Sequence, residues 1–447
     1  MKSRSSWLVI VALIAGLLLG ALAGSGGGGW REPAVEAAST IGGLWLDALK
    51  MTVVPLIVAL LVTGIVAGAE HARAGGTARR AIIWFVSILT GSAIIGALMT
   101  PLLVSLFPLP ETAAAALRAG LASVDSSATE TPVPGAGELL RSFVPDNVVS
   151  AAAEGRTLAL VVFSLLFAFA IASLPAGKRR LLGSFFDAVG DALLVIIGWV
   201  LWLAPIGVFA LGFSVGAGAG AAALGAVAHY MAIVSAVGLV VIIVGYAIAL
   251  AVARWSPGEF QRAMFAPQAV AISTQSSLAS LPAMLVSAEA LRVSERVRAI
   301  VLPMSVALFR ATGPAMNMAV AVYIAHWLGI EPTLPQMLAA TAVAAVMSYG
   351  SASLPGQISF ITSIAPICLA LGVPITPLAL LVAVENIPDI VRTLGNVTLD
   401  VAVTGAVARG EKEIAETAPH GEAAIPVVAS TGAPPTMAGS STGPPAI

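Results

Sequence analysis

The sequence predicts an all-α polytopic membrane protein, and three observations support this prediction. Hydrophobic residues make up 58% of the 447 residues, and the mean hydropathy is +0.97. Charged residues make up only 10%, well below the quarter or so that is usual in soluble domains. Apolar runs long enough to span a bilayer recur along the chain, and none shows the alternating pattern of a transmembrane β-barrel.

The composition also limits the partners and the chemistry. A net charge of −1 indicates that the protein has no nucleic-acid partner. The single cysteine, Cys368, lies in an apolar run, which excludes an internal disulfide. Four scattered histidines form no metal-ligand pattern, so we expect no cofactor apart from a coupling ion. The segment Met1–Gly24 begins like a signal peptide, but we interpret it as a retained first helix because many more spans follow.

The first half of the chain contains six predicted spans, separated by polar, basic or glycine-rich segments. The polar segment Pro108–Glu154, which follows the third span, is predicted to be an exposed loop. Residues Glu413–Ile447 are rich in Ala, Pro, Thr, Ser and Gly and are predicted to be a disordered tail. The predicted spans are Trp7–Ala23, Ile41–Gly68, Ala81–Phe107, Arg156–Leu174, Leu181–Val215 and Ala221–Val252.

Basic residues predict the orientation in the membrane. If the spans are counted in this way, the basic clusters all fall on one side, and the positive-inside rule makes that side cytoplasmic. We therefore expect a multi-pass protein in the lipid of the cell inner membrane, with both termini in the cytoplasm. The clusters are Lys2/Arg4, Arg79/Arg80, Lys178–Arg180, Arg292/Arg296/Arg298 and Arg409/Lys412.

Two apolar segments in the second half, Pro267–Val286 and Met347–Leu371, are interrupted by polar and helix-breaking residues. Both contain Ala-Ser-Leu-Pro, at 279–282 and at 352–355. Paired breaks of this kind are typical of transporters built from inverted repeats, where the freed helix N-termini attract an anion. The alternative is two kinked helices whose serines bond back to their own carbonyls.

A polar stripe follows the apolar run Pro377–Val384. At about 100° per residue its members fall within roughly one third of a helix circumference. Each charge would cost at least about 2.5 kcal/mol in lipid, so the stripe is predicted to line a water-accessible site. The alternative is a structural ion pair between Asp389 and Arg392. The stripe consists of Glu385, Asp389, Arg392, Thr393, Asn396 and Asp400.

Four sequence features together resemble the glutamate/aspartate and dicarboxylate:cation symporter family. They are Leu49–Leu56, Ala204–Leu211, the two serine-rich breaks and Arg392–Asn396. The resemblance runs from about Trp7 to Arg409. It implies eight transmembrane helices plus two re-entrant helical hairpins, arranged as an inverted-repeat elevator transporter in a homotrimer. The hairpins would centre on Gln275–Pro282 and Ser348–Gly356, with the second hairpin as the outer gate.

The resemblance also implies a division into a fixed scaffold and a mobile transport part. The implied units are scaffold helices 1–2 (1–80), transport helix 3 (81–107), an extracytoplasmic loop (108–155), scaffold helices 4–5 (156–220), the remaining transport part (221–410) and a cytoplasmic tail (411–447).

The resemblance assigns roles to individual residues. Arg392 matches the arginine that holds the distal carboxylate of the substrate, a task that suits a planar guanidinium. Asp389 matches the acid that takes the amino group, which simple dicarboxylate carriers generally lack. Asn396 and Asp400 match sodium ligands. The other residues implied to contact substrate are Thr393, Asn396, Ser276, Ser277, Gly350, Ser351 and Gly356.

The seventh helix departs from the family pattern. Where the family has Asn-Met-Asp-Gly-Thr, with sodium bound by Asn and Asp, this chain has Phe309-Arg310-Ala311-Thr312-Gly313. At an effective dielectric of about 20, a guanidinium about 4 Å from sodium repels it by about 4 kcal/mol. Arg310 either replaces the ion, paired with Asp400 or Asp389, or points at neighbouring carbonyls.

The sequence therefore predicts a secondary transporter for aspartate or glutamate, with sodium-independent or proton-linked coupling. The alternatives are a C4-dicarboxylate symporter, a sodium-coupled symporter and, more remotely, an anion channel. Arg310, Asp400 and Glu385 are the candidate coupling residues, and Glu385 is the favoured proton carrier among Glu385, Asp389 and Asp400. An enzyme is not expected, because no histidine lies near Ser276 or Ser351 in sequence to activate a serine.

Overall fold

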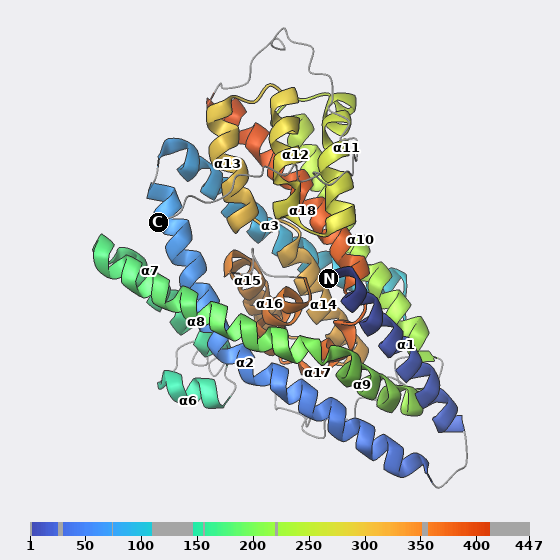
Figure 1. Ribbon diagram of the computed structural model, residues 1–447. Helices are drawn as coiled ribbons and strands as arrows, with labels where there is room; N and C mark the ends of the chain where they lie inside the picture. Colours follow the sequence, from blue (N-terminus) through green and yellow to red (C-terminus); the bar gives the residue numbers. More distant parts are fainter. Residues whose placement is uncertain are drawn as a thin grey trace, which may run out of the picture.

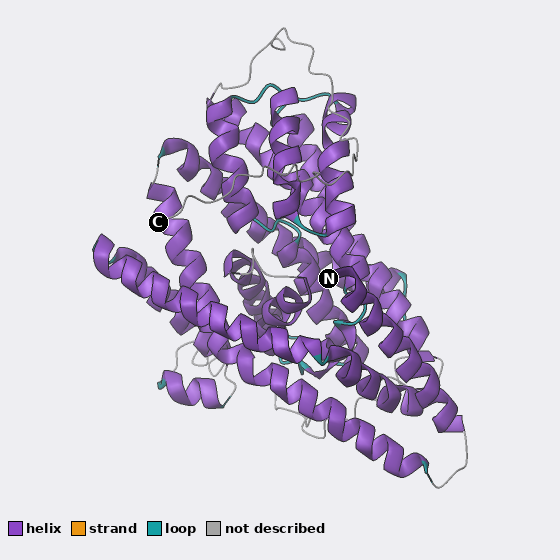
Figure 2. Ribbon diagram, viewed as in Figure 1, coloured by secondary structure: helices purple, strands orange, loops and turns teal. Residues whose placement is uncertain are grey.

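The computed structural model describes residues 2–25, 30–73, 75–109, 146–154, 157–219, 222–350 and 356–411. All regular structure in these ranges is helical, which confirms the predicted class (Figure 2). Within them, six helices are long and apolar enough to cross a membrane, and further apolar helices have 10–17 residues. The implied count of eight transmembrane helices stays a prediction.

One group of helices consists of the helices before residue 220 other than α3. Here α1 packs along α9, and α2 packs against α7, α8 and α9 (Figure 1). A Cβ at Gly20 would lie 2.1 Å from the carbonyl oxygen of Phe213, so α1 and α9 approach closely through small residues, as membrane helices often do. The group comprises α1 (Lys2–Ser25), α2 (Arg31–Arg73), α6 (Val148–Ala153), α7 (Thr157–Ser173), α8 (Ala176–Trp202) and α9 (Ala204–Ala219).

The second group surrounds α18. There α10 packs along α18, and α3 packs along α14. In the most apolar window of each helix, 83% of α18 is buried but only 11% of α8. The group comprises α3 (Gly76–Leu106), α10 (Ala222–Ala251), α11 (Pro257–Thr274), α12 (Ser277–Ala290), α13 (Glu295–Leu308), α14 (Gly313–Leu328), α15 (Leu334–Gly350), α16 (Gly356–Leu371), α17 (Thr376–Leu381) and α18 (Asn386–Glu411).

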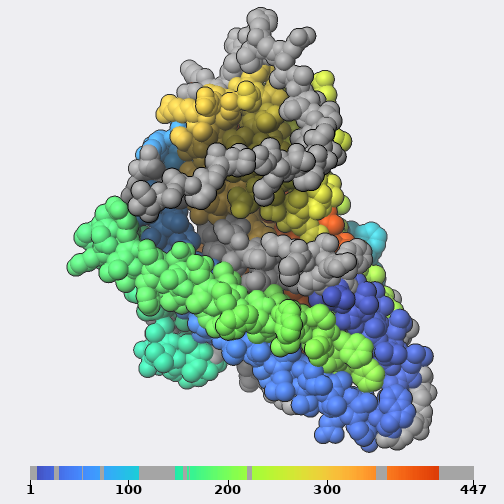
Figure 3. Space-filling model, in the orientation of Figure 1, coloured from blue at the N-terminus to red at the C-terminus, as the bar shows by residue number. Residues whose placement is uncertain are grey.

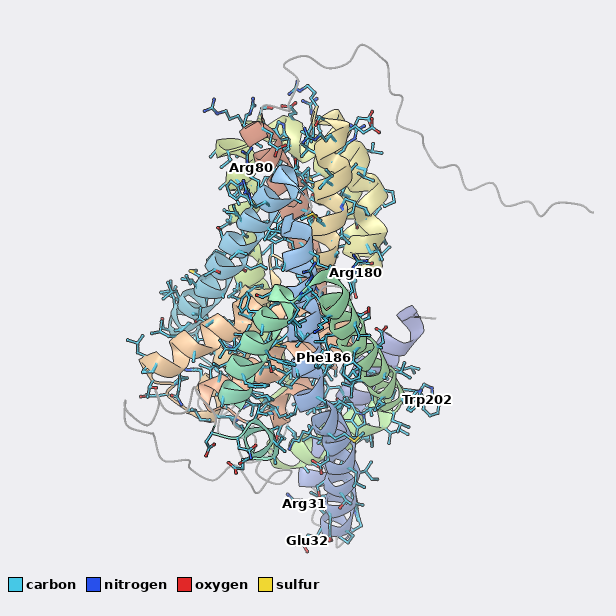
Figure 4. All side chains as sticks on the ribbon, turned by 90° about the vertical axis from the view of Figure 1, so that its left-hand side faces the viewer. Arg31, Glu32, Arg80, Arg180, Phe186 and Trp202 are labelled. Atoms are coloured by element: carbon cyan, nitrogen blue, oxygen red, sulfur yellow. The ribbon has the colours of Figure 1, made fainter. Side chains whose placement is uncertain are left out.

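Large apolar side chains lie on the outer surface, as expected where lipid replaces water. Trp202, at the end of α8, is 80% exposed and projects from the molecule in Figure 4, where Arg31 and Arg80 lie toward opposite ends. In Figure 3 the green band containing α8 crosses the molecule below the yellow helices of the second group. The exposed face of α8 is therefore available to lipid or to another subunit.

Three predicted elements differ in the structure. The fifth span, Leu181–Val215, is two helices that meet at Leu203. Part of the predicted loop Pro108–Glu154 is helical, because the Asn147 side chain accepts hydrogen bonds from the first N–H groups of α6. The tail predicted at Glu413–Ile447 lies outside the described residues, as does most of the 108–155 loop.

Candidate functional site

Arg392 is the centre of a buried ion-pair cluster at the start of α18. Its side chain is 3% exposed, and those of Glu385 and Asp389 are 1% and 6% exposed. Its Nη1 group donates to Glu385 Oε1 and, at 3.3 Å, to Asp389 Oδ1. Buried charges are tolerated when they are paired and hydrogen-bonded. One guanidinium thus compensates two carboxylates away from water.

The guanidinium retains a free donor. Nη2 donates to Asn317 Oδ1 on α14 at 3.4 Å. The Nε–H is buried and has no hydrogen-bond partner among the described residues. Because a guanidinium binds carboxylates through paired N–H groups, this remaining donor gives Arg392 capacity for a further anion.

Glu385 lies in the turn between α17 and α18, rather than on the helix as the sequence predicted. Pro388 explains the difference, because it has no N–H to bond to the carbonyl of Val384 and so favours a helix start. The N–H of Asp389 donates to the Glu385 carbonyl at 2.8 Å, so the turn leads directly into α18. The Thr393 hydroxyl, also buried, donates to the carbonyl of Asp389 at 2.8 Å.

Thr312 joins the break between α13 and α14 to α18. Its N–H donates to Asn396 Oδ1 at 3.0 Å, and its hydroxyl lies 2.7 Å from the same oxygen. Gly395 permits this approach, because a Cβ there would lie 2.3 Å from Thr312 Cγ2. The side-chain oxygen of Asn396, a predicted sodium ligand, is therefore already occupied by Thr312.

The other residues of this break are apolar or cationic. The Phe309 ring is 1% exposed and stacks on Phe85 of α3, with ring centroids 4.5 Å apart. Ala311 is fully buried. Arg310 is half-buried and interacts electrostatically with Asp389, Glu385 and Arg392. Of the two partners that the sequence allowed for Arg310, the structure brings Asp389 near it.

Asp400 is isolated from this cluster. It is fully buried, and neither of its carboxylate oxygens has a hydrogen-bond partner among the described residues. The hydroxyl of Ser305 on α13 donates to the Leu302 carbonyl at 2.9 Å instead. In the same ranges, no three His, Cys, Asp or Glu side chains gather in a metal-binding arrangement. The predicted pairing of Arg310 with Asp400 is not formed.

The first predicted hairpin is present as α11 and α12. Its break lies at Gln275 and Ser276 rather than across Gln275–Pro282, because Pro282 lies inside α12. Gln275 adopts the left-handed conformation, with φ of 50°, and Ser276 caps α12 by accepting from the N–H of Ala279 at 3.2 Å. Ser277 is the first residue of α12, and both serines are half-buried. The Gln275 side chain donates to the carbonyl of Asn386 at 3.3 Å, which places this tip beside α18.

At the place of the second predicted hairpin, α15 and α16 pack against each other, and the residues between them lie outside the described ranges. Gly350 is the last residue of α15 and Gly356 is the first of α16. Ser351 lies outside the described residues.

Three residues of the site were not predicted from the sequence. Tyr230 on α10 donates to Glu385 Oε2 at 3.5 Å, Asn317 contacts Arg392, and Thr312 contacts Asn396. Asn317 and Tyr230 are polar side chains within apolar helices, which is the signal that could have identified them. Thr312 carries no such signal, because its role follows from the close approach at Gly395.

Comparison with known proteins extends over nearly the whole chain. Residues 6–410 match the sodium:dicarboxylate symporter family. The proton/glutamate-aspartate symporter of Escherichia coli (strain K12) is 27% identical over 92% of this chain and 93% of its own length. A C4-dicarboxylate transport protein of Anaeromyxobacter sp. (strain K) is 29% identical over 92% and 91%.

A third relative, the proton/sodium-glutamate symport protein of Bacillus subtilis (strain 168), is 28% identical over 87% of this chain and 89% of its own length. The family and two of these relatives are named as symporters, and the Anaeromyxobacter relative is named as a transport protein, so the chain is a transporter and not an enzyme. The apolar helices agree with a multi-pass membrane protein. On the match from residue 6 to residue 410, the chain belongs to the sodium:dicarboxylate symporter family.

Proposed function

We propose that this protein is a secondary active transporter for acidic amino acids, aspartate or glutamate. The observation that carries the proposal is the guanidinium of Arg392, which is buried at the start of α18 and keeps an Nε–H that has no partner among the described residues. A carboxylate on a small substrate is the group that this donor suits. Thr393, the next residue, and Asn396, one turn further along the same helix, would supply polar contacts.

An α-amino group would be held by Asp389. Among the described residues its carboxylate accepts only a 3.3 Å hydrogen bond from Arg392, so it retains acceptor capacity for an ammonium group. The half-buried tip at Ser276 and Ser277, where α12 begins, would receive the α-carboxylate on helix N–H groups. Gly350, Ser351 and Gly356 would close the site from the second hairpin. Two of the relatives described above are named for glutamate transport, which agrees with this choice.

A C4-dicarboxylate substrate is the second candidate. Asp389 is near two guanidinium groups, those of Arg392 and Arg310, and their charge weakens its attraction for an ammonium group. Other relatives are named C4-dicarboxylate transport proteins. Competition between succinate and aspartate therefore decides between the two candidates.

We infer that coupling is linked to protons rather than to sodium. Phe309 and Ala311 offer no side-chain oxygen, Asn396 is occupied by Thr312, and Arg310 adds positive charge. Glu385 provides the link to protons, because it occupies the Arg392 guanidinium that the substrate needs. Protonation of Glu385 would release Arg392, so proton and substrate would favour each other's binding.

The architecture proposed for this function is a homotrimer in the cell inner membrane, with both termini cytoplasmic. The group α1, α2 and α7–α9 would be the scaffold, while α3 and α10–α18 would move as the transport part of an elevator. Support comes from the preferential packing within each group and from the exposed apolar face of α8.

Reconstituted uptake tests the proposal. Proteoliposomes should accumulate labelled aspartate or glutamate under an inward proton gradient, and much less under a sodium gradient. Internal unlabelled substrate should accelerate uptake by counterflow, which an anion channel does not show. Accumulation of succinate but not aspartate would move the substrate to C4-dicarboxylates, and flux without counterflow would refute the transporter.

A further inference from the structure

A chain of titratable side chains leads from the edge of the protein to the Arg392 cluster. His229 and Tyr230 belong to α10, and Tyr323 belongs to α14. The chain begins beside Phe107, which follows α3 and has an exposed side chain. It ends at Glu385, which is 1% exposed.

His229 can keep its hydrogen bonds with either one or two ring protons. Its Nε2 lies 2.7 Å from the carbonyl oxygen of Phe107 and must carry a hydrogen, because a carbonyl oxygen only accepts. Its Nδ1 lies 2.9 Å from the Tyr323 hydroxyl, which donates to the neutral ring. When Nδ1 is protonated it donates to Tyr323 instead, whose hydroxyl then turns to the Ala226 carbonyl, 3.3 Å away. The His229 ring therefore keeps a hydrogen-bond partner at each nitrogen in both its neutral and its protonated form, so it can accept a proton without losing either partner.

Tyr323 and Tyr230, the inner two side chains between His229 and Glu385, are almost fully buried. The Tyr323 and Tyr230 rings meet edge to face with centroids 5.5 Å apart, and the residues are 2% and 0% exposed. The Tyr230 hydroxyl reaches Glu385 Oε2 at 3.5 Å. Apolar burial separates these phenols from bulk water, so a proton that reaches Glu385 from this side has to pass through its neighbours. The pocket at the two rings is completed by Ala226, Val227, Trp327 and Leu381.

The charged groups at the inner end explain why a proton would be needed there. Arg392 and Asp389 of α18 and Arg310 of the α13–α14 break face Glu385. While Arg392 pairs with Glu385, the carboxylate is compensated. A substrate carboxylate that takes Arg392 leaves Glu385 buried without this partner, which is strongly unfavourable. Arrival of substrate therefore creates a demand for one proton at Glu385.

We propose that His229 takes up the coupling proton and that Tyr323 and Tyr230 carry it to Glu385, an inference that rests on the proposed function. The proton passes from Nδ1 of the imidazolium to the Tyr323 oxygen, while the Tyr323 hydroxyl proton passes to Tyr230 and that of Tyr230 to Glu385 Oε2. Both phenols end neutral, His229 returns to imidazole and Glu385 becomes a carboxylic acid. The hydroxyls of the two tyrosines share no hydrogen bond in the described structure, so this step requires their side chains to move.

The test compares Tyr323→Phe and His229→Gln with the control Tyr246→Phe in proteoliposomes. Tyr246 also lies on α10, but its hydroxyl donates to Gln261 and not to any of the side chains between His229 and Glu385. Net uptake of labelled aspartate under a pH gradient is measured together with internal acidification. Counterflow exchange is measured without a gradient. We expect net uptake and acidification to fall at least tenfold in both relay variants, with exchange within twofold of wild type, because exchange needs no new proton in each cycle.

The control Tyr246→Phe should match wild type in both assays. Net uptake at the wild-type rate in both relay variants would refute the proposed relay. Equal loss of exchange and net uptake would also overturn it, because a purely structural role affects both. His229→Gln keeps an amide that can donate to the Phe107 carbonyl, so it remains a test if Tyr323→Phe misfolds. Absence of any acidic-substrate transport in wild-type vesicles would instead refute the proposed function.

Discussion

Two buried acidic sites, one at the start of α18 and one about 16 Å further along the helix axis, differ in how their charge is compensated. At the start of the helix, Glu385 and Asp389 share the guanidinium of Arg392. At Asp400, neither carboxylate oxygen has a hydrogen-bond partner in the described part of the chain. Both carboxylates of the first site are paired with Arg392, so an anionic ligand has to compete with them for the guanidinium. The second site is unsatisfied, so a cation or a proton gains by binding there.

The difference arises from the break between α13 and α14. The Phe309 ring turns away to stack on Phe85, and Thr312 occupies the oxygen of Asn396. Arg310 contributes its charge to the cluster that contains Asp389. Side chains of this break therefore strengthen the first site electrostatically, and none of them forms a hydrogen bond with Asp400 in the described structure. A site for an organic anion is thereby favoured over one for a hard cation.

The largest expected effect is that of Arg392→Ala. The substitution removes the only partner cation of Glu385 on α18 and the donor for the substrate, so aspartate affinity should fall at least a thousandfold. Equilibrium binding by calorimetry measures the loss. Arg409→Ala is the matched control, because Arg409 lies on the same helix and donates only to the Ala253 carbonyl in the described structure. Unchanged aspartate affinity in a folded Arg392→Ala protein would contradict the assignment.

Asp389 should decide between amino acids and plain dicarboxylates. In the wild-type protein, succinate should compete at least tenfold less well than aspartate, because only aspartate has an ammonium group for Asp389. In Asp389→Asn, aspartate should lose at least tenfold in affinity while succinate changes less than threefold. Competition against labelled aspartate measures both. Equal competition by succinate in the wild type would assign the protein to dicarboxylates.

Glu385→Gln should remove the internal competitor for Arg392. Wild-type affinity for aspartate should rise as pH falls, because protonated Glu385 no longer holds the guanidinium and proton and substrate binding are linked. In Glu385→Gln, affinity at pH 8 should be about tenfold higher than in the wild type and nearly independent of pH. Glu259→Gln is the control, since Glu259 pairs with Arg292 outside this cluster. A pH profile that Glu385→Gln leaves unaltered would exclude this role.

The sodium response should be smaller still. Wild-type affinity for aspartate should differ less than threefold between sodium and choline buffers. Dependence on sodium should appear when oxygen ligands are restored by Phe309→Asn, Arg310→Met and Ala311→Asp. Adding Thr312→Gly, which removes the hydroxyl contact with the Asn396 oxygen but keeps the backbone N–H, should increase it further. Affinity at least tenfold higher in sodium for the wild-type protein would show that the break does bind the ion.

These features differ in how far the sequence predicts them. The helical class, the two broken segments and the stripe from Asp389 to Asp400 follow from hydropathy, turn residues and helical periodicity. The position of Glu385 in a turn does not, because periodicity alone extends the helix through it, whereas Pro388 ends it. The partners Asn317, Tyr230 and Thr312 come from other helices, and a periodic pattern within one helix contains no information on contacts between helices. Residue 351 of the predicted second hairpin lies outside the described residues, so its role stays a prediction.

The smallest expected effect concerns Asp400, the buried carboxylate that has no hydrogen-bond partner among the described residues. Asp400→Asn replaces this buried carboxylate by a neutral amide, which costs less to bury, so the free energy of unfolding in choline should rise by about 1–3 kcal/mol. Asp389→Asn should lower it, because Arg392 loses a partner. Thermal unfolding in detergent, followed by intrinsic fluorescence, measures both variants in choline and in sodium. If Asp400→Asn is less stable than the wild type in sodium only, Asp400 binds that ion, and the two sites on α18 would no longer differ in the way the structure indicates.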